Sequence, residues 1–163
     1  MRRALSTLLS VLALLAITTA TAMAAITFHS GPTVTWNSDG SATATGNLSG
    51  LGNQPATATL QITQSFSYTC VNKGGNTAPG QNQVTTIGAP GTQTLSPTER
   101  NGRSDLAVTA FPGSPATTIS GNAAGCPNGN WSGRNPVATG PATATLTITQ
   151  GGQTIYGPAT FTQ

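Results

Sequence analysis

Apolar and polar side chains alternate along several stretches of this chain. At positions 56–70 the even-numbered residues are apolar except for Gln64, and the odd-numbered residues are Thr, Ser or Gln. The same alternation occurs at positions 142–149 and, more briefly, at 106–110. A period of two places alternate side chains on opposite faces of a β-strand. Each stretch therefore predicts a half-buried strand, and the first predicts either one long strand or a strand pair bent near Gln64.

Turn-forming residues separate these stretches. Positions 37–40 read Asn-Ser-Asp-Gly and predict a hairpin turn between strands at 33–36 and 41–45. Positions 50–53 predict another turn, and positions 73–82 and 111–116 predict longer loops. No stretch after residue 24 has a helical period. About eight or nine short strands with regular turns predict an all-β fold, an antiparallel two-sheet β-sandwich of the immunoglobulin-like or Greek-key type.

Two sequence segments occur twice. Positions 46–50 and 129–133 both read Gly-Asn-X-Ser-Gly, and positions 55–64 and 141–150 are identical at nine of ten residues. One interpretation is that low-complexity strand sequence arose twice. The interpretation that we favour is a pair of equivalent hairpins in two superimposable halves of the sandwich, because both motifs occur in the same order.

The N-terminus has a different pattern. Arg2 and Arg3 precede an apolar run at positions 5–17, and positions 22–24 read Ala-Met-Ala, as at a signal-peptidase site. The run is shorter than the ~18 residues of a membrane-spanning helix. We therefore predict a signal peptide over residues 1–24, no membrane insertion, and a secreted, extracellular protein with a single β-sandwich domain over residues 25–163.

Removal of this leader leaves a nearly neutral chain. The full sequence has six Lys and Arg and three Asp and Glu residues, and two of the arginines belong to the leader, so the mature net charge is about +1. Nucleic-acid binding needs a patch of Lys and Arg to replace counterions on the phosphates. Four scattered cations do not form such a patch. We expect no nucleic-acid partner.

Cys70 and Cys126 are the only two cysteines in the chain. In an oxidising compartment two cysteines form one disulfide by default. Closing a loop of roughly 57 residues stabilises a fold by ~4 kcal/mol on the chain-entropy estimate. A zinc site would need two further ligands, and His29 is the only histidine. The sequence therefore predicts a disulfide and neither a metal nor a cofactor.

Several motifs resemble those of a known group of proteins. These are SGLGN at 49–53, TCVNKGGN at 69–76 followed by PGQN at 79–82, and GCPNGNW at 125–131. Together they resemble a family of small exported proteins that are mostly actinobacterial, with some fungal members, and that have no assigned activity. The resemblance implies secretion and a Cys70–Cys126 pair. In size and composition the chain is also similar to the apoproteins that carry enediyne antibiotics, although those have two disulfides at other spacings.

Catalytic chemistry has few candidate residues. A Ser-His-Asp triad would need His29 with a serine and Asp39 or Asp105, and a contact of His29 with both partners would support an enzyme. The charged segment 99–105 holds Glu99 and Asp105 beside two arginines, which keep carboxylates ionised and unsuited to general-acid work. We expect that the protein is not an enzyme. The segment is either a solvated turn or a recognition loop.

Binding has more candidates, in two polar loops and among the aromatic residues. Trp36 and Tyr68 fall at inward-facing positions and are predicted core residues, whereas Trp131 either packs on the disulfide or contacts a ligand. The sequence predicts non-enzymatic binding of an extracellular ligand, such as a polysaccharide, cell wall or protein, by a monomer. A small-molecule carrier and a protein inhibitor are the alternatives, and a hydrolase is the third. The predicted binding residues are Lys73, Asn76, Asn82, Arg100, Arg103, Trp131 and Tyr156.

Overall fold

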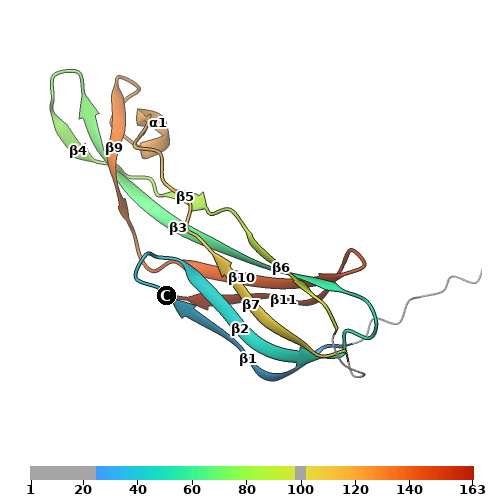
Figure 1. Cartoon of the computed structure of the whole chain (residues 1–163). Helices are drawn as coiled ribbons and strands as arrows, with labels where there is room; N and C mark the ends of the chain where they lie inside the picture. Colours follow the sequence, from blue (N-terminus) through green and yellow to red (C-terminus); the bar gives the residue numbers. More distant parts are fainter. Residues whose placement is uncertain (1–24, 98–101) are drawn as a thin grey trace, which may run out of the picture.

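The computed structural model describes residues 25–97 and 102–163, so the predicted signal peptide and Arg100 lie outside the described residues. Within these ranges the chain forms eleven strands and one short helix. The strands form two antiparallel sheets, which confirms the predicted all-β sandwich (Figure 1). The immunoglobulin-like assignment stays a prediction.

The smaller sheet consists of β1 (Thr27–Trp36), β2 (Ala42–Ser49) and β7 (Ser104–Ala110), in the order β1-β2-β7. The predicted hairpin between the first two strands is confirmed, because Trp36 pairs with Ala42 across the turn. The carboxylate of Asp39 accepts hydrogen bonds from the hydroxyl (2.7 Å) and the amide (2.9 Å) of Ser41. These bonds stabilise the carboxylate and lower the pKa of Asp39 below its ordinary value.

The larger sheet is built around β3 (Ala56–Asn72), a single strand of 17 residues. Along one edge lie β10 (Thr143–Gln150) and then β9 (Trp131–Ala138), and along the other lie β6 (Gly91–Leu95), β5 (Val84–Ile87) and β4 (Thr77–Pro79). Strand β11 (Gln153–Thr162) pairs with β10, and β8 (Thr118–Ser120) pairs with β9. The long-strand alternative is therefore correct, and Gln64 marks where the partner changes from β10 to β9.

The repeated segments lie side by side in this sheet. They form β3 and β10, which pair antiparallel in a register that is symmetric about the pair Leu60–Leu146. Both leucines are fully buried. The two Gly-Asn-X-Ser-Gly motifs, by contrast, belong to the end of β2 in one sheet and the start of β9 in the other. The prediction of two equivalent hairpins is therefore wrong. The two copies of the longer repeat do form corresponding strands, which pair with each other.

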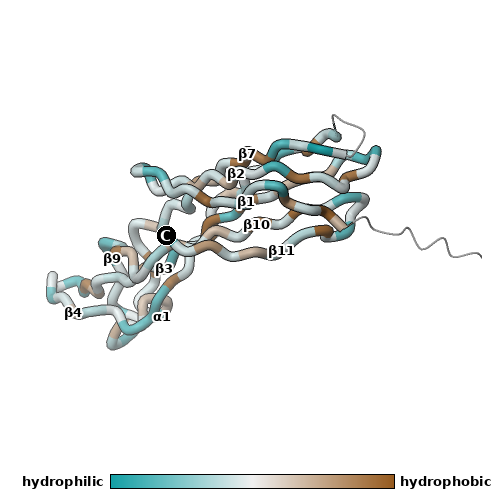
Figure 2. Tube along the Cα trace, turned by 90° about the horizontal axis from the view of Figure 1, so that it is seen from below, coloured by the Kyte–Doolittle hydropathy of each residue, from teal (hydrophilic) through white to brown (hydrophobic). Residues whose placement is uncertain are grey.

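The main core fills the space between the two sheets. Among the residues that the structure describes, this core contains 16 buried apolar residues from β2, β3, β6, β7, β10 and adjoining turns, and Trp36 packs against them as predicted. Beyond this sandwich the C-terminal part of β3 continues into a narrow extension with β4, β8, β9 and the helix α1 (Gly121–Ala124), which stands apart from the sandwich in both views (Figure 1 and Figure 2). We call residues 66–83 and 117–138 the distal lobe. Its own core has three buried residues, Tyr68, Cys70 and Ala124.

The outer strands of the sandwich are protected against pairing with other chains. Edge strands β1 and β11 contain Pro32 and Pro158, each preceded by glycine and each in a cis peptide bond. Proline has no N–H to donate, which interrupts the row of groups that another strand would pair with. At β7 the side chain of Gln93 occupies backbone groups that another strand could otherwise pair with. Its amide donates to the carbonyl of Asp105 (3.0 Å), and its side-chain oxygen accepts from the amide of Ala107 (2.7 Å).

Candidate functional site

A disulfide joins the two segments that build the tip of the distal lobe. Cys70 lies in β3 and Cys126 follows α1, and their sulfur atoms are bonded with Cα atoms 5.7 Å apart. This confirms the predicted pairing. Helix α1 packs closely against β9 near the disulfide. A Cβ on Gly133 of β9 would lie only 2.7 Å from the Cβ of Ala124 in the helix. A glycine at this position therefore allows the close approach.

The disulfide holds together the loops around an open depression at the tip of the lobe. The depression has a volume of about 480 Å³. One wall is the turn that follows β3, and the other is the segment that precedes β9, where Asn72 pairs with Trp131 across the two strands. The lining residues are Asn72, Lys73, Gly74, Asn128, Asn130 and Trp131.

Both loops are fixed by their own asparagines. The side-chain oxygen of Asn72 accepts from the amide of Asn76 (2.9 Å), and that of Asn128 accepts from the amide of Asn130 (3.0 Å). The amide of Trp131 also donates to the carbonyl of Asn128 (3.3 Å). Such bonds hold a turn in one conformation. The walls of the depression are therefore held in place by hydrogen bonds within the protein.

Trp131 fits both interpretations made from the sequence. It packs against the small core that contains Cys70 and Tyr68, and its half-exposed side chain also lines the depression. Lys73 beside it is exposed, and among the described residues its ammonium group has no ion pair or hydrogen bond. The distal lobe contains Lys73 and Arg134 but neither Asp nor Glu. The depression therefore combines an aromatic surface, amide groups and a positive charge.

The other predicted binding residues do not join Lys73 and Trp131 in this depression. Asn76 stabilises the adjoining turn, whereas the side-chain amide of Asn82 donates to two carbonyls of α1, those of Asn122 and Ala123 (3.3 Å each). Arg103 is an exposed residue just before β7, in the sandwich.

Tyr156 lies in the sandwich and is only partly exposed. Its ring is half-buried against the main core, with an edge-to-face contact to Phe28 at a centroid distance of 4.9 Å. Tyr156 therefore does not line the depression, and its part in binding stays a prediction. Strand β11 turns this ring inward, on the same face as Phe161.

Three asparagines that line the depression were not predicted from the sequence. Asn72 and Asn128 each lie two residues after a bridged cysteine, and Asn130 precedes Trp131. The equal distance of Asn72 and Asn128 from the two cysteines could have indicated them. If the two cysteines are bonded, the residues that follow each of them must lie near one another, and their side chains belong to one site.

His29 contacts a serine, as a hydrolase would require. Its Nε2 lies 2.8 Å from Oγ of Ser49, on the exposed face of the smaller sheet. The carboxylate of Asp105, on β7 of the same sheet, accepts from the side-chain amide of Asn47 (2.7 Å). No carboxylate contacts His29 among the described residues, so the described geometry provides two of the three groups of a triad.

Comparisons with known proteins give no relative. No protein-family model, no curated protein sequence and no solved structure matches the chain. In the part of the chain that the structure describes, no helix is long and apolar enough to cross a membrane, and no group of three or more His, Cys, Asp or Glu side chains is placed to hold a metal ion. The assignment of a function therefore rests on the site itself.

Proposed function

We propose that this is an exported, non-enzymatic binding protein whose distal lobe recognises a saccharide of a cell surface or extracellular polysaccharide. One observation carries the proposal. Lys73 and Trp131, from loops far apart in the sequence, line one depression with three asparagines, next to the disulfide that holds both loops.

This combination suits a sugar ring. An aromatic side chain offers an apolar surface with one polar edge, and amide side chains both donate and accept hydrogen bonds, as sugar hydroxyls do. The unpaired ammonium group of Lys73, in a lobe without acidic residues, favours sugars with carboxylate or carbonyl groups over those with hydroxyls alone. Fixed loops reduce the entropy lost on binding.

Several features support action outside the cell as a monomer. The disulfide is stable in an oxidising compartment, and residues 1–24 have the pattern of a signal peptide. The prolines of β1 and β11 oppose association through the sheet edges. An open depression at the surface fits a polymer better than the enclosed cavity that a small-molecule carrier uses.

Binding to polysaccharides tests this proposal. The secreted protein with its disulfide intact is mixed with insoluble cell-wall material, with polygalacturonate and with dextran, and the bound fraction is measured. We expect retention by at least one, and about a tenfold weaker affinity for Lys73→Gln and Asn130→Ala.

Arg134→Gln is the matched control, because it removes the other positive charge of the lobe. Arg134 lies on β9 opposite Thr69 and does not line the depression. Equal losses for Lys73→Gln and Arg134→Gln would show a non-specific charge effect. Absence of binding to all three materials, or retention that both depression variants leave unchanged, would refute the proposal.

A further inference from the structure

A second hollow lies in the other sheet, on the outer face formed by β1, β2 and β7. Its volume is about 440 Å³. It arises where β1 departs from a regular register: Phe28 pairs with Leu48, but Thr33 pairs with Thr45, so β1 contains two more residues than β2 over this stretch. Bulges of this kind bend a strand and change the direction of its side chains.

Two glycines at this hollow let β1 and β2 approach each other closely. Gly31 has a φ of 77°, and a Cβ there would lie 2.6 Å from the carbonyl oxygen of Thr45. A Cβ on Gly46 would lie 2.9 Å from the carbonyl oxygen of Ser30. Both positions therefore exclude a side chain. The backbone of β1 and β2, with its irregular register, therefore sets the shape of the hollow.

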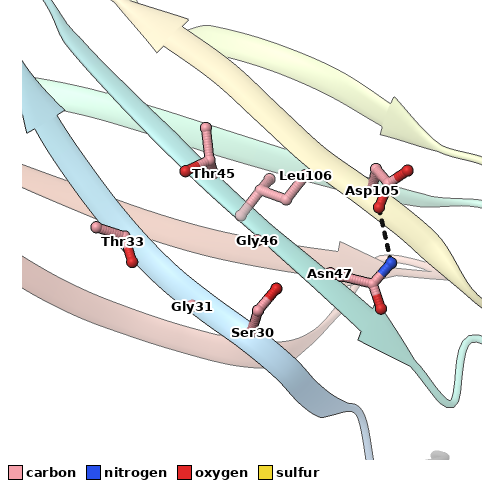
Figure 3. A pocket seen from close by; sticks show the side chains of 8 residues that line it. All are labelled: Ser30, Gly31, Thr33, Thr45, Gly46, Asn47, Asp105 and Leu106. Carbon is pink, nitrogen blue, oxygen red and sulfur yellow. Dashed lines mark hydrogen bonds between the residues drawn. The ribbon is translucent and has the colours of Figure 1, made fainter.

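Polar groups surround the hollow (Figure 3). Ser30, Asn47 and Asp105 gather at one end of it, and Thr33 and Thr45 lie toward the other. The side-chain amide of Asn47 donates to Oδ1 of Asp105 at 2.7 Å. This bond orients the amide and leaves two acceptors, Oδ1 of Asn47 and Oδ2 of Asp105. The three hydroxyl groups have no hydrogen-bond partner among the described residues.

We propose that this hollow binds one residue of a neutral saccharide, which is a site beyond the proposed function of the distal lobe. Adjacent sugar hydroxyls donate to the two fixed acceptors, and the donor to a carboxylate forms a charge-assisted bond. The Ser and Thr hydroxyls serve as donors or acceptors for the remaining oxygens. The negative charge of Asp105 opposes acidic sugars, the reverse of the preference expected at Lys73. Without an aromatic surface in the lining, the affinity is weak, with a dissociation constant of ~1 mM.

Amide NMR on the labelled secreted protein tests this site. The probes are four neutral tetrasaccharides, of glucose, mannose, galactose and N-acetylglucosamine, with trigalacturonate as the acidic control, each to about 10 mM, or ten times the expected dissociation constant. We expect at least one neutral probe to shift the amides of Gly31, Gly46 and Asn47, and trigalacturonate to leave them unchanged.

Two variants and a control on the same face separate binding from folding. Thr45→Val removes a hydroxyl at nearly constant shape, and Asp105→Asn removes the charge; each is expected to weaken neutral-sugar binding here about fivefold to tenfold. Thr109→Val removes a hydroxyl of the same face outside the hollow, where it bonds Thr43 at 2.9 Å, and should leave binding unchanged. Amide signals elsewhere report whether each variant folds.

The outcomes also separate this site from the distal depression. The inference is overturned if no neutral probe shifts these amides, if trigalacturonate shifts them equally, or if both Thr45→Val and Asp105→Asn bind as the wild type does. Lys73→Gln should not affect these shifts. Loss of binding at the distal lobe alone therefore counts against the proposed function and leaves the second site standing.

Discussion

The sandwich and the distal lobe are stabilised in different ways. The sandwich buries 16 apolar residues between two sheets, whereas the lobe buries three and adds the Cys70–Cys126 bridge. Burial of apolar surface is the dominant favourable term in folding, so a region with little of it needs another constraint. The disulfide supplies that constraint at the depression. The candidate site therefore lies in the region that relies on a covalent bond in place of a large core.

Removing the disulfide should produce the largest difference in stability between the lobe and the sandwich. In the double variant Cys70→Ser/Cys126→Ser, the free energy that keeps the lobe folded should fall by ~4 kcal/mol, the chain-entropy value for a loop of this length. Native-state hydrogen exchange should show lost protection at positions 131–134 of β9. The amides of β10 in the sandwich should keep their protection from exchange. Uniform loss over both regions would remove the distinction between them.

A cavity in the sandwich should act on both regions. Leu146→Ala deletes a fully buried side chain at the centre of the β3–β10 pair, and we expect the free energy of global unfolding to fall by ~3 kcal/mol. Because β3 runs through both regions, denaturant unfolding should remain a single transition at a lower midpoint. If the lobe kept its stability while the sandwich lost it, the regions would be independent.

The polar anchor of the lobe core should have a smaller effect. Tyr68 is 3% exposed, and its hydroxyl donates to the carbonyl of Ala116 at 2.9 Å. Tyr68→Phe should destabilise the lobe by ~1 kcal/mol. Tyr156→Phe is the matched control in the sandwich, since the hydroxyl of Tyr156 has no hydrogen bond among the described residues, and it should change stability by less than ~0.5 kcal/mol. Equal effects in thermal unfolding would contradict the assigned role of Tyr68.

The smallest effect concerns the β1–β2 turn. Asp39 has its pKa lowered mainly by the Ser41 hydroxyl and then by the Ser41 amide. A folded-state pKa below the unfolded value adds stability above the unfolded pKa, and this is lost as pH falls through the folded pKa. Ser41→Ala should raise the pKa of Asp39 toward its ordinary value, as measured by NMR titration of its carboxyl carbon. An unchanged pKa would show that the hydroxyl is not the cause.

The alternation of side chains predicted the strands but not their partners. The long strand through positions 56–70 and the hairpin at 37–40 followed from local pattern and turn residues. The pair Asn47–Asp105 depends on the register between β2 and β7, which are far apart in the sequence, and no local pattern determines it. The hollow beside that pair was therefore not predictable.

Two of the predicted binding residues lie together because of a covalent restraint that the sequence already indicated. The disulfide brings Lys73 and Trp131 into one depression, and the same reasoning would have found Asn72 and Asn128. Helix α1 was missed because four residues are too few for a helical period, although Ser120 and Gly125 at its ends are typical capping residues. The packing of Tyr156 against the main core was not predictable, because a single aromatic residue does not indicate toward which face a strand turns it.

The most direct test of the central claim is amide NMR on the labelled protein, with its disulfide intact, in the presence of soluble fragments of cell-wall polysaccharide. The proposal predicts shifts at positions 72–74 and 128–131, together with the indole N–H of Trp131, and their loss after reduction of the disulfide. Shifts confined to the sandwich, or shifts at the lobe that persist in the reduced protein, would contradict the claim that a disulfide-ordered depression binds the ligand.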